Sequence, residues 1–537
     1  MKGSATQRRL GSFLLWGGLL AFVVAFGMAP LALMIVQAVG RHDSATSFFD
    51  RRTGSLLART LALALSAALL ATLLGTAAGY RLGVTTWKGK GLARVILILP
   101  LVISPYLHAI GWTTLLRAGG PFSSWLSATF GVARDFTSNI IYSFAGATVV
   151  LALAYFPIAL FFTEKSLSLS SPSLVEAAQV FGANRWQAFR TAHWPFIRPA
   201  FASSGMIIFL LAASDLGVPT ILKVRVFNFE VFTRLSAFND VTAATLLTLP
   251  LLLVGLLAVG VERRVTAADG IQHDVREVQP PRAASRRQVV INIILFGSVA
   301  AVALGLPFGA IVAEGANREA VQRMIRLAVQ PGLNTLRYAI TAAAVMTFAF
   351  FILALITNTA PRWQRRTTDG LLVLGFAVPS TILALALLAL YDRPVIARWI
   401  TPSALVVAAL VVRYGIVGYR ILGTAIAQIP DELVEAAASL GAGRVRIAVH
   451  VILPMTRVAL ITTFAISFIL AVGEIGSTIL LYPPGGETLP IALYSIEANS
   501  PRSYVAAMTI LLLALCVIPL ILVALLVRTI SHGSERE

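Results

Sequence analysis

The stretch PDELVEAAASLG at residues 430–441 organises the rest of the chain, because a second copy of its pattern, SPSLVEAAQVFG, occupies residues 171–182. Glu435 lies 259 positions after Glu176, and the closing glycine and the next downstream proline of each copy keep the same spacing. Unrelated segments would rarely keep three landmarks in one register. The sequence therefore predicts an internal repeat of two related halves.

Each copy has the features of a short amphipathic helix. Proline suits the first helical position, where a missing N–H costs nothing, and we place Pro172 and Pro430 there. Leu433, Ala437 and Leu440 share one helix face by their spacing, and the closing glycine permits a left-handed turn. A helix of about ten residues is only marginally stable alone, so we expect this apolar face to dock against another surface. A connecting turn that was duplicated with the rest of the chain is the alternative.

This pattern resembles the signature loop of the membrane-spanning subunits of binding-protein-dependent ABC importers, which reads Glu-Ala-Ala, three residues, Gly and, further on, Ile-x-Leu-Pro. The second copy continues as VILP at residues 451–454, close to that ending, whereas the first has AHWP at residues 192–195 and is expected to dock less tightly. The resemblance implies that each loop is a coupling helix seated in a cleft of an ATPase subunit. The implied coupling residues are Glu176, Ala177, Ala178 and Gly182 in the first copy and Glu435, Ala436, Ala437 and Gly441 in the second.

The composition places much of the chain in lipid. Of 537 residues, 57% are hydrophobic and 12% are charged, and the mean hydropathy is +0.83. A soluble protein of this size could not hide so much apolar surface in its own core. Apolar runs of about twenty residues span a bilayer, and the sequence contains roughly twelve of them. The predicted fold is therefore an all-α, multi-pass membrane protein.

The charged and sulfur-containing residues exclude several kinds of site. The net charge of +19 is typical of basic cytoplasmic loops near anionic lipid, and no basic stretch carries the interleaved aromatic residues of a nucleic-acid groove. The single cysteine, Cys516, allows no intrachain disulfide, and the six histidines show no metal-ligand spacing. We expect no nucleic-acid partner, no metal site and no cofactor on this chain.

The apolar runs fall into two sets of six. We place the spans near residues 13–39, 56–80, 93–116, 140–162, 196–222 and 243–261, and then near 289–312, 333–357, 370–390, 403–422, 456–482 and 504–527. A polar, arginine-rich stretch containing two consecutive prolines separates the sets. The expected organisation is a first half (residues 1–262), a cytoplasmic linker (263–287) and a second half (288–537).

An even number of spans in each half makes the two halves parallel repeats, with both signature loops on one side of the membrane. Lysine and arginine are enriched in the segments that a cytoplasmic N-terminus would place inside. Thr60 corresponds to Thr335 at an offset of 275, whereas the later landmarks are 259 apart. The first half therefore carries 16 extra residues, which we place in an external loop around residues 119–139.

Two acids within predicted spans are candidates for function, because a charge in lipid is costly. Asp215 and Glu474 are again 259 positions apart, and each stands two positions before a glycine, Gly217 or Gly476. About twenty residues, or about 30 Å of helix, separate each acid from its loop proline, which puts both toward the outer end of the fifth span. Two interpretations stay open: the acids and glycines lie beside a central pathway or gate, or each acid caps a helix end.

The sequence after the second acid, YPPGGETLP at residues 482–490, resembles the ferric-iron branch of the same importer family, whose permeases are often fused, double-length chains. This resemblance implies the type I importer permease fold in the bacterial cytoplasmic (inner) membrane. It also implies two ATPase subunits that bind ATP and Mg and an external binding protein that delivers ferric iron. The branches for thiamine, phosphonates and polyamines are alternatives.

No catalytic constellation is present in the sequence. The nearest approach to a phosphate-binding loop, at residues 89–91, has Val84 where the first glycine belongs, so ATP hydrolysis is expected on separate subunits. An ion-gradient-driven secondary transporter is the main alternative from another class, and a lipid-modifying membrane enzyme is a second. Two interpretations are open for four aromatic residues, which either line the pore or are core or lipid-facing side chains, and the second is favoured: Tyr106, His108, Trp112 and Tyr414.

Overall fold

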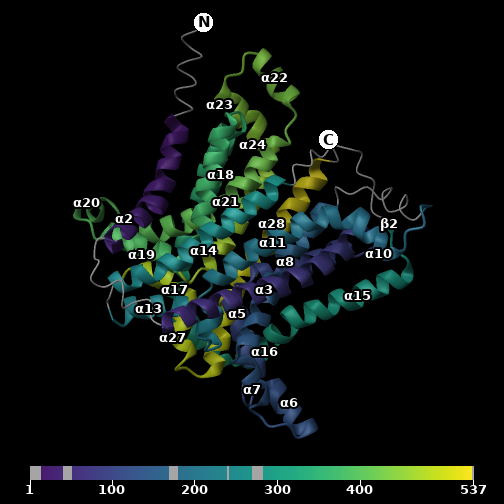
Figure 1. The fold of residues 1–537 in the computed structure, drawn as a ribbon, viewed down its shortest axis with the longest axis vertical. Helices are drawn as coiled ribbons and strands as arrows, with labels where there is room; N and C mark the ends of the chain where they lie inside the picture. Colours follow the sequence, from purple (N-terminus) through teal and green to yellow (C-terminus); the bar gives the residue numbers. More distant parts are fainter. Residues whose placement is uncertain (1–13, 40–50, 168–179, 239–240, 269–281, 535–537) are drawn as a thin grey trace.

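The chain folds into a bundle of membrane-length helices (Figure 1). The computed structural model describes residues 14–39, 51–167, 180–238, 241–268 and 282–534. These residues contain nine helices long and apolar enough to cross a membrane, or up to twelve if three bent helix pairs each count as one span. The prediction of an all-α protein with about twelve spans is confirmed.

The spans follow the predicted order in both halves. The first half contains the span Leu14–Val36, followed by α3 (Arg51–Val84), α4 (Lys90–Val102), α5 (Pro105–Leu116), α8 (Phe144–Leu167), α11 (Trp194–Ser214) and α14 (Val241–Ala268). The second contains α15 (Arg286–Ala300), α16 (Leu306–Gly315), α17 (Arg318–Asn358), α18 (Arg362–Ala377), α19 (Ser380–Tyr391), α21 (Pro402–Ala427), α25 (Arg457–Val472) and α28 (Arg502–Ser534).

The third span of each half is broken, although the sequence analysis expects a continuous helix. The axis turns by 94° between α4 and the segment that begins with α5, and by 101° between α18 and α19. Ile103 and Val378, at the two breaks, have extended backbone. Proline disfavours helical backbone at the residue before it, and Pro105 and Pro379 stand at the breaks. The breaks are 275 positions apart, as the repeat requires.

The second and fourth spans of each half pack closely through one glycine, but the glycine is on a different helix of the pair in each half. In the first half a Cβ on Gly75 of α3 would lie 2.2 Å from the backbone oxygen of Phe156 on α8, so only glycine fits there. The equivalent positions in α17 and α21 are Phe350 and Gly415, and a Cβ on Gly415 would lie 2.4 Å from the Phe350 ring. Small residues let membrane helices approach closely. In the first half the glycine is on α3, whereas in the second half it is on α21, the helix equivalent to α8.

The first span of each half packs against the other half. The Trp16 indole donates to the Thr368 hydroxyl of α18 over 3.0 Å. In the reciprocal contact α16 lies against α5, where a Cβ on Gly111 would come within 2.8 Å of Pro307. The boundaries expected from the sequence therefore separate two sequence repeats. In the structure, the first span of each repeat packs against the other repeat.

The linker and the inserted loop take up the residues between the spans. Helix α14 continues to Ala268, so residues 263–268, expected to belong to the linker, are helical; residues 269–281 lie outside the described part. The linker ends in a two-residue strand, β2 (Arg282–Ala283), paired in parallel with β1 (Thr85–Thr86). The first half carries α6 (Pro121–Phe130) and α7 (Phe136–Ile141) where the second has only α20 (Pro394–Trp399), as the 16-residue offset predicts.

A pair of equivalent threonines caps one short helix in each half. The Thr60 hydroxyl accepts the backbone N–H of Phe227, the first residue of α13 (Phe227–Ser236), over 2.8 Å. The Thr335 hydroxyl accepts the N–H of Leu489, the first residue of α27 (Leu489–Glu497), also over 2.8 Å. Each threonine thus satisfies a donor that the helix itself leaves without a partner.

Candidate functional site

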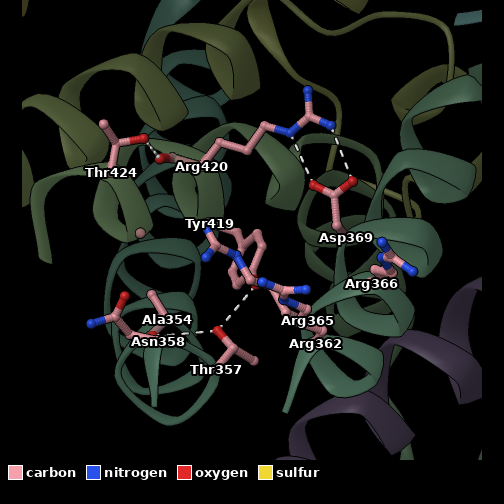
Figure 2. Close-up of a pocket in the computed structure, with 11 residues that line it drawn as sticks. Ala354, Thr357, Asn358, Arg362, Arg365, Arg366, Asp369, Tyr419, Arg420 and Thr424 are labelled. Atoms are coloured by element: carbon pink, nitrogen blue, oxygen red, sulfur yellow. Dashed lines mark hydrogen bonds and ion pairs between the residues drawn. The ribbon is translucent and has the colours of Figure 1, made fainter. Parts of the chain in front are cut away.

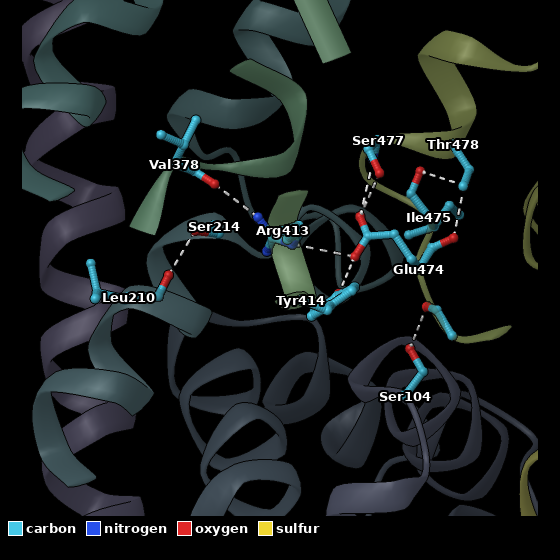
Figure 3. A network of polar contacts seen from close by, with 11 residues as sticks. Ser104, Leu210, Ser214, Val378, Arg413, Tyr414, Glu474, Ile475, Ser477 and Thr478 are labelled. Atoms are coloured by element: carbon cyan, nitrogen blue, oxygen red, sulfur yellow. Dashed lines mark hydrogen bonds and ion pairs between the residues drawn. The ribbon is translucent and has the colours of Figure 1, made fainter. Parts of the chain in front are cut away.

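A cavity of about 120 Å³ lies where the two halves meet. It is lined by the broken third spans, by the middle of the fourth spans and by the ends of the fifth spans, and Figure 3 draws several of its polar residues. Its polar and glycine residues are Ser104, Tyr106, Tyr155, Ser214, Asp215 and Gly217 from the first half and Ser380, Arg413, Tyr414, Gly473, Glu474 and Gly476 from the second. The structure thus brings together all four residues that the sequence analysis selected for a pathway or gate.

Asp215 and Glu474 occupy equivalent places at the ends of the fifth spans. Helix α11 ends at Ser214 and α25 ends at Val472, so both acids follow a helix end. An Asp215 oxygen accepts the Val218 N–H over 2.8 Å, and a Glu474 oxygen accepts the Ser477 N–H over 3.0 Å. Each acid therefore caps a local turn and also lines the cavity, and a role beside a pathway or gate stays a prediction.

Glu474 is also held by charged and hydroxyl groups of α21. Its second carboxylate oxygen lies 3.5 Å from Arg413 Nε and accepts a hydrogen bond from the Tyr414 hydroxyl. Arg413 Nη1 donates over 2.9 Å to the carbonyl of Val378, the residue at the break between α18 and α19 (Figure 3). Arg413 and Glu474 are both buried, so this ion pair ties the fourth, fifth and broken third spans of the second half together.

Asp215 has no such ion pair among the described residues. Position 154, equivalent to Arg413, is Ala154, while Tyr155 is equivalent to Tyr414 and lines the same cavity. The cavity therefore contains two acids, two equivalent tyrosines and a single arginine. One carboxylate is matched by a cation of the protein and the other is not.

The glycines after the acids let the fifth spans approach the broken third spans. A Cβ on Gly217 would lie 3.0 Å from Cβ of Tyr106, and one on Gly476 would lie 2.2 Å from the Ser380 hydroxyl. Across the interface between halves, the Ser104 hydroxyl donates to the Gly473 carbonyl over 3.2 Å. Larger side chains at these positions would force the cavity walls apart.

The second signature loop forms the short helix α22 (Asp431–Ser439), which lies at the top of Figure 1 and contains Glu435, Ala436 and Ala437. The helix begins one residue later than expected, because Pro430 has extended backbone and stands at the N-cap. No residue of α22 is buried, and the apolar Leu433 and Leu440 are 45% and 90% exposed. The predicted apolar face is therefore present and has no cover within the described part of the chain.

The first signature loop is described only at its end. Glu176, Ala177 and Ala178 lie outside the described residues. Gly182 has φ 81° and Gly441 has φ 82°, the left-handed conformation expected at the end of each helix. Phe181, equivalent to Leu440, is also 90% exposed.

Arg413 and Tyr155 line the cavity, although no pattern in the sequence singled them out. Tyr106 and Tyr414 also line it, in contrast to the favoured interpretation of core or lipid-facing side chains. Buried His108 instead bonds the carbonyl of Pro100 over 3.0 Å, as a core residue does. The 259-residue offset, applied to the fourth spans, would have found the two tyrosines as a pair. It could not have found the arginine, whose equivalent is alanine.

Comparisons with known proteins agree with this architecture. Residues 350–532 match the family described as binding-protein-dependent transport system inner membrane component. The chain is 25% identical to the putative ferric transport system permease protein FbpB 1 of Haemophilus influenzae, over 73% of this chain and 64% of that protein. It is 24% identical to the Fe(3+)-transport system permease protein FbpB 2 of the same organism, over 92% of this chain and 94% of that protein.

A shorter relative is the putative 2-aminoethylphosphonate transport system permease protein PhnV of Salmonella paratyphi A. It is 37% identical over 18% of this chain and 36% of its own length. The chain thus spans a little under two thirds of the first ferric relative and nearly all of the second.

Proposed function

We propose that this chain is an inner-membrane permease of a binding-protein-dependent ABC transport system and that it forms the whole channel of an ATP-driven importer. The observation that carries this proposal is the small cavity between two interlocked halves, lined by equivalent acids. A cavity at the interface of repeats can face either side of the membrane when the repeats move against each other. In this conformation the third and fifth spans close around it.

Two ATPase subunits, which bind ATP and Mg, would supply the energy at the two signature loops. The exposed apolar face of α22 supports this role, because an apolar surface beside a loop of charged residues is typical of a docking site. ATP-driven closure of the ATPase pair would move both loops together and open the cavity toward an external binding protein. The chain itself would contribute no catalytic group to ATP hydrolysis.

The proposed solute is ferric iron, delivered by the external binding protein. The names of the two long relatives support this choice. Oxygen ligands suit hard cations, and the polar groups of the cavity include two carboxylates and three phenol side chains, those of Tyr106, Tyr155 and Tyr414. Phosphonate is the alternative that the shorter relative suggests, and thiamine and polyamines are further alternatives within the same class.

The test is reconstitution of the chain in vesicles with its ATPase and its loaded binding protein. The variant G441A puts a side chain at φ 82°, which costs about 1–2 kcal/mol and should distort the docking loop. G443A is the matched control, because Gly443 has φ −72° and open space around it. We expect G441A and the double variant E176A/E435A to insert normally but to lose ATPase association and uptake, whereas G443A behaves as the parent protein.

Normal ATPase association in E176A/E435A would contradict the coupling role. Uptake that stops when the proton gradient is dissipated, with ATP still present, would favour a secondary transporter instead. Uptake of 2-aminoethylphosphonate without uptake of iron would keep the channel function and replace the proposed solute.

A further inference from the structure

The second half contains a large cavity of about 790 Å³ that the central site does not use. Three helices enclose it: the end of α17, the first two turns of α18 and the last turns of α21 (Figure 2). Its lining residues are Ala354, Thr357, Asn358, Arg362, Arg365, Arg366, Asp369, Tyr419, Arg420, Gly423 and Thr424. Helix α21 leads directly into α22, so the cavity lies on the side of the membrane that carries the signature loops.

Most of the positive charge in this cavity has no counter-charge. Arg420 is held by Asp369 through two hydrogen bonds, of 3.1 and 3.2 Å. The other three arginines, Arg362, Arg365 and Arg366, form no ion pair with any described residue. In Figure 2 no dashed line joins these three side chains to another residue drawn. The cavity thus has a net positive lining.

In the equivalent region of the first half, one carboxylate contacts both cations. Arg94 and Lys90 are equivalent to Asp369 and Arg365. Glu164 accepts hydrogen bonds of 3.0 and 3.1 Å from Arg94 Nε and lies 3.9 Å from Lys90 Nζ. The residue equivalent to Glu164 is Gly423, which lines the large cavity. Each region thus has one carboxylate, Glu164 or Asp369, but the second half sets four arginines against it where the first half has Lys90 and Arg94.

The positions of the three arginines make an external anion favourable. They are residues 1, 4 and 5 of α18, near the positive end of the helix dipole, and the first turn contains no acidic residue. Cations at a helix N-terminus, and like charges three or four residues apart on one face, are both destabilising. The cavity volume is within the range of small-molecule sites. Guanidinium groups present a planar fork of donors that matches phosphate oxygens.

We propose that this cavity binds a phosphate-type oxyanion at the three arginines. The source is either the headgroup of an anionic phospholipid or a soluble phosphate compound, since both present the same oxygens to the guanidinium groups. Thr424, at the cavity wall, is seven residues from the start of α22. Occupancy would therefore stabilise the segment that leads into the second coupling helix. This inference does not depend on which solute the channel carries.

The experiment measures apparent Tm of the purified full chain in detergent. The additions are inorganic phosphate alone, phosphatidylglycerol, and phosphatidylcholine as the neutral control. We expect phosphate or phosphatidylglycerol to raise the Tm of the parent protein. The triple variant R362Q/R365Q/R366Q should bind the same anion at least about tenfold more weakly, because each lost charged hydrogen bond is worth about tenfold or more. The matched control R318Q/R323Q/R326Q removes three exposed arginines from the start of α17 and should keep the full Tm shift.

The second variant, G423E, tests the inference without removing any arginine. A side chain at this position meets open space. The new carboxylate takes the position of Glu164 and adds a negative charge beside Arg365, the equivalent of Lys90, although Asp369 stands where the first half has Arg94. We expect G423E to keep a Tm close to that of the parent protein in the absence of ligand and to abolish the shift produced by the anion. This result also separates loss of binding from loss of folding.

A Tm shift from inorganic phosphate, lost in G423E and in the triple arginine variant, would support a soluble phosphate ligand. A shift that requires phosphatidylglycerol, lost in the same variants, would support a lipid headgroup. Retention of the full shift in both variants would overturn the proposal. So would loss of ATPase association in the triple variant with unchanged phosphate and phosphatidylglycerol binding, which would assign the arginines to a protein partner.

Discussion

Asp215 and Glu474 are equivalent by sequence, yet the two halves surround them differently. Glu474 is buried against Arg413 and accepts a hydrogen bond from Tyr414, whereas Asp215 faces the same cavity without an ion pair in the described structure. A duplicated acid thus became a fixed structural pair in one half and an uncompensated carboxylate in the other. The two acids keep one position in the repeat, but among the described residues only Glu474 is matched by a cation of the protein.

Removing Arg413 should have the largest effect on stability. R413M leaves Glu474 buried without its counter-charge, and losing one partner of a buried ion pair costs about 3–5 kcal/mol. The free energy of unfolding in mixed SDS micelles measures this loss.

The double variant R413M/E474Q serves as the control for this assignment. With both charges gone, no buried charge lacks a partner, so the double variant should be more stable than R413M alone. A double variant as unstable as the sum of the two single variants would mean that Arg413 and Glu474 act independently. The asymmetry between the halves would then have another cause.

Removing the threonine caps should affect both halves equally, in contrast to the acids. T60V and T335V each leave the buried N–H of Phe227 or Leu489 without an acceptor, at a cost of about 1–3 kcal/mol. T60S and T335S keep the hydroxyl and are the matched controls. The same unfolding measurement applies. A large effect in only one half would show that the repeat is less symmetrical at its caps than the hydrogen bonds indicate.

A smaller effect is expected from E164Q in the first half. This change releases Arg94 and Lys90 from Glu164, but the Arg94 side chain is 45% exposed, so the loss in unfolding free energy should be about 1 kcal/mol or less. E319Q, an exposed acid on α17, is the control and should leave the unfolding free energy nearly unchanged.

Much of the architecture follows from the sequence because lipid imposes strong constraints. The number of spans, the position of the inserted loop and the meeting of Asp215 with Glu474 follow from hydropathy and a constant offset. The breaks at Pro105 and Pro379 carried a local signal, since proline disfavours the preceding helical turn. The apolar runs continue on both sides of each proline, and for this reason the sequence predicts one continuous helix at each place.

Other features depend on contacts that no sequence pattern encodes. The exchange of first spans, seen at Trp16 and Thr368, joins residues 352 positions apart. The constant offset of 259 residues identifies only residues that both halves share. It could not identify Arg413, because the equivalent residue is Ala154. The arginine-lined cavity was missed for the same reason, because Gly423 is informative only beside Glu164 once the equivalent helices are compared in space.

D215N should have the smallest effect on stability. It is also the most direct test of the difference between Asp215 and Glu474. Asparagine caps a helix turn about as well as aspartate, so it should still accept the Val218 N–H, and the unfolding free energy should change by no more than about 0.5 kcal/mol. D215A loses this hydrogen bond and should cost about 1 kcal/mol. If the carboxylate of Asp215 meets a cationic solute, both variants should lose iron uptake to a similar extent despite their different stabilities. If Asp215 acts only as a cap, D215N should transport normally and only D215A should be impaired, which would remove the functional asymmetry between the two acids.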